Sequence, residues 1–274
     1  MLSYRHSYHA GNHADVLKHI VEIAVLDYLI EKDKPLTYID THSAQGLYAL
    51  QGDHASKNKE HLEGVAKIDH SQHELLSRYA TFSDANWYAG SVNIAQQILR
   101  EDDKLRCFEL HPNDYSMLCR NTQGDKRVKC FDSDGFKGLI AQVPPQTKRA
   151  AVMIDPSYEL DSDYNQVINT LKGALQRFAV GVYMVWYPLL SKIEVQRFQK
   201  QLEKLSAAGQ SVKFLHAQLQ VRKPSPGMYG SGMFIINPPW KLKNQLQEIL
   251  PQLVKQLGEP GKGASFSLST SKGL

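Results

Sequence analysis

The sequence predicts an α/β fold in which a mostly parallel β-sheet carries helices on both faces. Short apolar runs, rich in β-branched and aromatic residues, recur along the chain, and patterns with helical spacing separate most of them. Strands that alternate with helices are typical of parallel sheets buried on both faces. The 274 residues suffice for one large domain or two small ones with a full hydrophobic core, so the fold requires no disulfide or metal ion.

The apolar runs are the predicted strands. Each run is short and continuous, and polar or turn-forming residues flank it, which is typical of a strand that is buried on both faces. The predicted strands cover residues 36–39, 105–110, 128–131, 150–154, 180–187 and 233–236.

The patterns between these runs predict helices. In the clearest pattern, apolar residues within 17–28 form one stripe, and Asn12 or Asp15 is expected to cap its start. Residues 224–232 concentrate proline and glycine and predict a loop, and the Gly- and Ser-rich tail from Gly258 is expected to fray. Further helices are predicted at residues 91–100, 112–120, 164–178, 192–205 and 242–257.

Residues 47–87 interrupt this alternation. The stretch is polar, rich in His, Lys and Asp, and without a good strand, and it is too long for a simple connection. We therefore expect a small helical insertion at residues 47–87 within a single domain that spans residues 1–274.

Composition and charge exclude several classes of protein. Hydrophobic residues make up 42% and charged residues 22%, which is ordinary for a globular protein, and the net charge of +4 neither proves nor opposes a polyanionic partner. Cys107, Cys119 and Cys130 lack metal-ligand spacing and favour the reducing cytoplasm. The start of the chain has no apolar signal segment, and the longest apolar run, residues 179–190, is too short to cross a bilayer, so we expect no membrane association.

Acidic residues follow three of the predicted strands. Asp40 comes after the first, Glu109 ends the second and Asp155 follows the fourth. Because ligands of open α/β sheets bind at the carboxyl ends of the strands, these carboxylates are candidate site residues. Glu109 is placed to accept both hydroxyls of an adenosine ribose, although it is also placed to cap the next helix. Residues 40–46 occupy the position of a nucleotide-binding turn but hold one glycine, so this fingerprint is weak.

The string Asp155-Pro156-Ser157-Tyr158 combines a carboxylate, a carbonyl fixed by proline and an aromatic ring. Two acceptors that hold the hydrogens of an exocyclic base amine would localise the nitrogen lone pair and direct it at a methyl donor. The ring of Tyr158 would stack on a flipped-out base. The alternative is an ordinary Asp-Pro turn after a strand.

A second string of this kind spans Asn237 to Trp240 and also pairs an acceptor with proline and an aromatic residue. The fourth strand of a doubly wound sheet lies beside the first at the switch point, whereas a late strand lies near an edge. The order of the strands therefore favours Asp155, and Asn237 is expected to be structural.

The N-terminal residues 4–19 interleave basic, aromatic and imidazole groups. Aromatic and basic side chains suit stacking on bases and contact with phosphates. A metal site is less favoured because no cysteine or pair of carboxylates accompanies the histidines. A polar, partly ordered leader remains the alternative.

Five segments together resemble one family: residues 1–19, 40–42, 109–112, 134–136 and 155–158. The chain is similar, nearly end to end, to the RlmJ-type 23S ribosomal RNA adenine-N6 methyltransferases. The resemblance implies a class I, Rossmann-like S-adenosylmethionine domain with a small helical insertion. It also implies transfer of a methyl group to N6 of one adenine in 23S ribosomal RNA, which leaves S-adenosylhomocysteine, by a cytoplasmic monomer that needs no metal.

The resemblance also implies roles for individual residues. The S-adenosylmethionine pocket would be lined by His19, His42, Ser91, Glu109, Asp134, Gly135 and Asp155. Asp155 would be catalytic together with Pro156 and Tyr158, and the substrate RNA would contact Tyr4, His6 and Lys18.

Two departures from the family pattern keep alternatives open. Ser157 stands where the family usually has a second proline, and residues 43–46 form a glycine-poor turn. These departures motivate a non-catalytic RNA-binding relative as the alternative function. A histidine-rich metal hydrolase is the last-ranked alternative.

Overall fold

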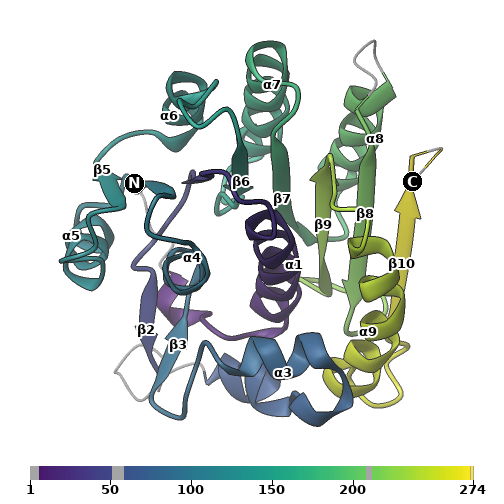
Figure 1. Ribbon diagram of the computed structural model, residues 1–274. Helices are drawn as coiled ribbons and strands as arrows, with labels where there is room; N and C mark the ends of the chain where they lie inside the picture. The colour runs from purple at the N-terminus through teal and green to yellow at the C-terminus, as the bar shows by residue number, and fades with distance from the viewer. Residues whose placement is uncertain (1–5, 51–58, 208–211, 272, 274) are drawn as a thin grey trace.

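An eight-stranded sheet forms the centre of the computed structural model, which describes residues 6–50, 59–207, 212–271 and 273. The strand order is β10-β8-β9-β7-β6-β1-β4-β5, and Figure 1 shows the sheet running from β5 on the left to β10 on the right. The strands are β1 (Thr37–Asp40), β4 (Lys104–Phe108), β5 (Val128–Phe131), β6 (Ala150–Ile154), β7 (Val182–Leu189), β8 (Phe214–Gln220), β9 (Gly230–Ile236) and β10 (Ser265–Thr270).

The five strands β5, β4, β1, β6 and β7 are parallel to one another, and β1 lies between β4 and β6. The strand order reverses between β1 and β6, which is the switch point where ligands of open α/β sheets bind. The mostly parallel sheet predicted from the sequence is confirmed, with β9 and β10 as antiparallel members.

Helices cover both faces because successive strand residues point in opposite directions. On β6, Met153 belongs to the core under α1 (His13–Ile30), α4 (Ser91–Ile98) and α9 (Leu242–Leu257). Its neighbour Val152 belongs to the opposite core, under α6 (Gly135–Gln142), α7 (Ser162–Arg177) and α8 (Ile193–Ala207). Leu118 of α5 (Pro112–Asn121) joins the first core. None of the helices in the described ranges is long and apolar enough to cross a membrane.

The stretch at residues 47–87 contains short helices, and a pair of strands brackets it. The antiparallel strands β2 (Leu47–Ala49) and β3 (Trp87–Ala89) correct the expectation that no strand occurs there, since three residues are too few to show a period. Figure 1 places α3 beside α9, and there the Asp69 N–H donates to Gln256 Oε1 at 2.6 Å. The helical elements are η2 (Glu60–Glu63), η3 (Val65–Lys67), η4 (His70–Gln72) and α3 (Glu74–Ala80).

The predicted strands and helices are confirmed to within a few residues. Asn12, and not Asp15, caps α1, because Asn12 Oδ1 accepts from the N–H groups of Ala14 and Asp15 at 2.9 and 3.1 Å. The prediction missed β8 and α6. It was wrong about the tail, because Ser265–Thr270 pairs with β8 along its whole length. A largely exposed edge strand in which serine alternates with other residues gives a weak signal.

The direction of β9 decides between the two proline-containing strings. Because β9 runs antiparallel to β7, the end of β9 lies beside the start of β7. Asn237 therefore lies at the opposite end of the strands from Asp155. Asn237 Nδ2 donates there to the carbonyls of Ala179 and Gly181 at 2.7 and 2.8 Å. Asn237 is therefore structural, as predicted, but the reason is strand direction and not distance from the switch point.

The packing of α6 on β4 generates a testable prediction. A Cβ at Gly138 would lie 2.2 Å from the ring of Phe108, which stacks on Phe131 and has little freedom to move. We expect Gly138→Ala to lower the free energy of unfolding by about 1–3 kcal/mol. In the control Gly173→Ala, the new Cβ would meet only the flexible end of Ile140, and stability should stay equal or rise by up to about 1 kcal/mol. Urea unfolding followed by circular dichroism measures both, and equal losses would contradict this packing.

Candidate active site

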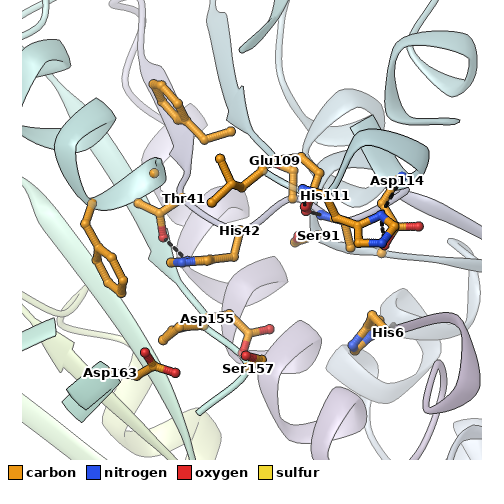
Figure 2. A pocket seen from close by; sticks show the side chains of 18 of the residues that line it. His6, Thr41, His42, Ser91, Glu109, His111, Asp114, Asp155, Ser157 and Asp163 are labelled. Atoms are coloured by element: carbon orange, nitrogen blue, oxygen red, sulfur yellow. Dashed lines mark hydrogen bonds and ion pairs between the residues drawn. The ribbon is translucent and has the colours of Figure 1, made fainter. Parts of the chain in front are cut away.

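A cavity of about 570 Å³ opens at the carboxyl ends of β1, β4 and β6. Figure 2 shows Asp155 and Ser157 at one end of it and Glu109 and His111 at the other. Tyr4 lies outside the described residues, and Tyr158 does not line the cavity. The predicted residues that do line it are His6, Lys18, His19, His42, Ser91, Glu109, Asp134, Gly135, Asp155 and Pro156.

The turn after β1 is held by Asp40, which lies beneath the cavity and is fully buried. Asp40 Oδ1 accepts from the His42 N–H at 3.1 Å and Oδ2 accepts from Ser91 Oγ at 2.5 Å. Burial raises the pKa of Asp40 to about 6. Burial also lowers the pKa of His42 to about 4, so this imidazole is neutral at pH 7. Asp40 thus joins the turn after β1 to the start of α4.

The glycine-poor part of the turn adopts a backbone that favours glycine. Ala44 has φ of 46°, in the left-handed region, where a Cβ costs about 1 kcal/mol. The Ala44 N–H donates to Glu109 Oε2 at 2.8 Å, which stabilises this conformation. The departure from the family pattern therefore leaves the turn in place.

Glu109 follows β4 and faces the cavity across the turn. Its Oε1 accepts from the N–H of His111 at 2.7 Å, and the N–H of Leu110 also donates to this carboxylate. The N-cap of α5 is His111, so the structure does not support the alternative that Glu109 caps this helix. Burial, with a further contribution from the carboxylate of Asp114, raises the pKa of Glu109 to about 6.

Asp134 and Gly135 close the cavity on the side of α6. Asp134 caps the helix, with Oδ1 accepting from the Phe136 N–H at 2.9 Å. A Cβ at Gly135 would lie 1.8 Å from the carbonyl oxygen of Thr41. Only glycine therefore lets the start of α6 approach the turn after β1 this closely.

Lys18 connects the N-terminal helix to the end of β6. Its Nζ lies 2.6 Å from Asp155 Oδ2 and 2.7 Å from Asp15 Oδ1, and only 6% of its side chain is exposed. Asp15 Oδ2 also lies 2.9 Å from His6 Nε2. Burial disfavours the charged form of Lys18, yet the two carboxylates hold the pKa of Lys18 well above its ordinary value. Interactions with His6 and Lys18 likewise overcome burial and hold the pKa of Asp15 well below its ordinary value.

Tyr158 departs from its predicted position. Its hydroxyl donates to the carbonyl of Trp186 at 2.7 Å, and its ring packs on Tyr164 and Phe198 in the core. The residue is 5% exposed and has φ of 51°. The structure therefore does not bring this ring together with the other predicted residues. Among the described residues, the tyrosine and phenylalanine rings that line the cavity are those of Tyr48, Phe108 and Phe136.

Sequence reasoning missed the role of Asp15, whose signal was its i, i+3 spacing to Lys18 on α1. It also missed Tyr88, whose hydroxyl lies 2.7 Å from Nδ1 of His19. The other ring nitrogen of His19, Nε2, is buried and has no hydrogen-bond partner in the described part of the chain. Within the same part of the chain, no three His, Cys, Asp or Glu side chains are grouped to hold a metal ion.

Comparisons with known proteins identify the family of this chain. Residues 33–268 match the family model described as ribosomal RNA large subunit methyltransferase D, RlmJ. Ribosomal RNA large subunit methyltransferase J of Escherichia coli is 42% identical, over 96% of both chains. The protein of the same name from Haemophilus influenzae is 41% identical, over 96% of this chain and 97% of the relative.

A solved structure has the same fold. The crystal structure of a Legionella pneumophila protein covers 97% of this chain and 99% of its own, with a TM-score of 0.88 and 32% identity. The predicted fold class, a Rossmann-like methyltransferase sheet flanked by helices, is confirmed. The chain belongs to the family of ribosomal RNA large subunit methyltransferase D, RlmJ.

Proposed function

We propose that this protein transfers a methyl group from S-adenosylmethionine to N6 of an adenine in 23S ribosomal RNA. The observation that carries the proposal is the position of Asp155 and Pro156, which follow β6 beside the switch point and line a cavity with Glu109 at its other end. The names of the curated relatives support the reaction class and the ribosomal RNA substrate. They do not favour the alternative of a non-catalytic RNA-binding relative.

The residues of the cavity fit the cofactor. Glu109 lines the cavity with a carboxylate that suits the hydroxyls of the ribose, and Asp134 and Gly135 close the cavity on the side of α6. His42 and Ser91 line the middle, and the unpartnered Nε2 of His19 offers a further polar contact. When bound, S-adenosylmethionine supplies a methyl group made electrophilic by its sulfonium, so the protein has mainly to align and desolvate the reacting groups. We propose no metal in this reaction.

The chain's own contribution is to hold the adenine amine. One oxygen of Asp155, Oδ2, is bound by Lys18, and Oδ1 has no hydrogen-bond partner among the residues that the structure describes. We assign Asp155 and the carbonyl of Pro156 to accept the two N–H groups of the amine, which directs its lone pair at the methyl group. The amine is barely acidic, so its proton leaves only after nitrogen has become cationic.

The RNA side of the proposal rests on His6 and Lys18, which line the cavity. The role of Tyr4 stays a prediction. We assign Tyr158 to hold the turn through its bond to Trp186, in place of stacking on the base. Ser157 lines the cavity beside Asp155, where its hydroxyl adds a polar group in place of the family's proline.

We further propose that residues 1–274 act as a single domain, with residues 47–87 as a subdomain inserted in it. The contacts of this stretch with α9 support that arrangement. The protein would act as a monomer on unassembled RNA in the cytoplasm, and S-adenosylhomocysteine would be the product.

The first test replaces the acceptor. Asp155→Asn exchanges a carboxylate oxygen for a donor NH₂ group of the same size, so we expect the rate of methylation to fall by about 100- to 1000-fold or more. Nucleoside mass spectrometry of unmodified 23S ribosomal RNA measures N6-methyladenosine. The control Asp163→Asn changes another carboxylate that lines the cavity and should keep most of the activity. Full activity of Asp155→Asn would overturn the proposal.

The second test is the pH dependence of cofactor affinity. The ionised carboxylate of Glu109 accepts the ribose hydroxyls, and its pKa is about 6, so affinity is full above about pH 7 and falls as the pH drops through 6. We expect Glu109→Gln to weaken S-adenosylhomocysteine binding at pH 8 by about 10- to 100-fold and to flatten this decline. Asp40 also has a pKa of about 6, so a smaller decline remains. Calorimetric titration from pH 5 to 8 measures both, and an unchanged pH profile would remove Glu109 from the ribose site.

A further inference from the structure

A chain of hydrogen bonds leads from the helical insertion to the cavity. The hydroxyl of Tyr79, on α3, lies 3.1 Å from the hydroxyl of Tyr88, on β3. The Tyr88 hydroxyl lies 2.7 Å from Nδ1 of His19, on α1. All three side chains are buried, and of the three only His19 lines the cavity. These hydrogen bonds thus connect α3, β3 and α1 to the imidazole of His19.

Counting hydrogens gives this chain a direction. Burial holds the pKa of His19 well below its ordinary value, so the ring is neutral and carries one N–H. If Tyr79 donates to Tyr88 and Tyr88 donates to Nδ1, both hydroxyl hydrogens are used and the ring hydrogen sits on Nε2. In the reverse direction the buried Tyr79 hydrogen has no acceptor among the described residues, whereas in the first direction it is the Nε2 hydrogen of His19 that has none. A ligand in the cavity can accept from His19 but not from Tyr79, which does not line the cavity, so a bound acceptor favours the first direction.

The outer end of the chain is then a donor without a partner. Nε2 of His19 is buried and makes no hydrogen bond within the described ranges, although the residue lines the cavity. Buried donors are nearly always satisfied, so an unpartnered one beside a cavity indicates a ligand acceptor.

The start of α4 indicates the charge of that acceptor. Gly90 and Ser91 line the same cavity two and three residues after Tyr88, and Gly90 has no side chain with which to cap the helix. The first N–H groups of a helix carry a partial positive charge that favours an anion. Together with the Nε2–H group of His19, they suit a group that only accepts hydrogen bonds. In S-adenosylmethionine this group is the carboxylate of the amino-acid end, far from the ribose assigned to Glu109.

We propose that Tyr88, held by Tyr79 of the insertion, is a positioning residue that fixes His19 as an Nε2–H donor to the cofactor carboxylate. This inference rests on the proposed function and extends it. It gives the insertion a role at the cofactor, because Tyr79 lies on α3 and Tyr88 on the strand that closes the insertion. Removal of either hydroxyl would leave the cavity lined as before but free the histidine to place its hydrogen on Nδ1.

Two ligands test the proposal by calorimetric titration. S-adenosylhomocysteine carries the carboxylate, and 5′-methylthioadenosine shares the adenosine but lacks the amino-acid end. We expect Tyr88→Phe to weaken S-adenosylhomocysteine binding by about tenfold and to leave 5′-methylthioadenosine binding unchanged. Tyr79→Phe should act in the same direction by a smaller factor. The control Tyr183→Phe removes another buried hydroxyl, bonded to the carbonyl of Phe178, and should change neither affinity.

A purely structural role of Tyr88 would weaken both ligands alike or neither, and either result overturns the inference. If the wild type binds neither ligand, the proposed function itself fails. Failure of the proposed function is therefore distinguishable from failure of the inference about Tyr88. Nitrogen-15 NMR of the histidines in the wild-type complex, with His19→Gln to assign the signal, gives an independent readout. A hydrogen on Nε2 that moves in Tyr88→Phe supports the proposal, and a hydrogen on Nδ1 in the wild type overturns it.

Discussion

Lys18 carries a positive charge into the interior of the protein, where Asp15 and Asp155 compensate it. Removing one partner from a buried ion pair costs about 3–5 kcal/mol, because the other charge is left uncompensated. The three groups therefore hold one another in place. Since Lys18 and Asp15 lie on α1 and Asp155 follows β6, this network fixes the first helix against the switch point of the sheet. The proposed acceptor of the adenine amine depends on it, because Lys18 occupies one oxygen of Asp155 and leaves the other toward the cavity.

The residues that follow β1 and β4 complete the cavity at the carboxyl ends of the strands. Asp40 joins the turn after β1 to α4, and Glu109 joins the turn after β4 to the same loop. Among the described residues that line the cavity, six are acidic and one is a lysine, Lys18, which is shared by two carboxylates. The resulting negative potential suits the cationic cofactor that we propose, whereas the phosphates of an RNA would be repelled from these walls.

The sequence predicts those parts of the fold and site that follow from local rules. Buried parallel strands are continuous apolar runs, and polar residues at their carboxyl ends lie close together, so the sequence predicts that Glu109 and Asp155 share one cavity, which both of them line. Strand direction is not a local property, and this is why the antiparallel course of β9 went unpredicted. The position of Tyr158 was missed because its left-handed backbone turns the ring into the core. The pairing of Tyr88 with His19 spans 69 residues and depends on how the insertion packs.

The bond between Lys18 and Asp155 joins residues that are 137 positions apart in the chain. During synthesis the first helix leaves the ribosome long before its second carboxylate partner does, at about 5–20 residues per second. For that interval Lys18 has Asp15 nearby in sequence but no strand β6 to pack against. The bond between Lys18 and Asp155 can therefore form only after Asp155 has been synthesised. A nascent chain shorter than about 155 residues cannot present it to the RNA that surrounds the translating ribosome.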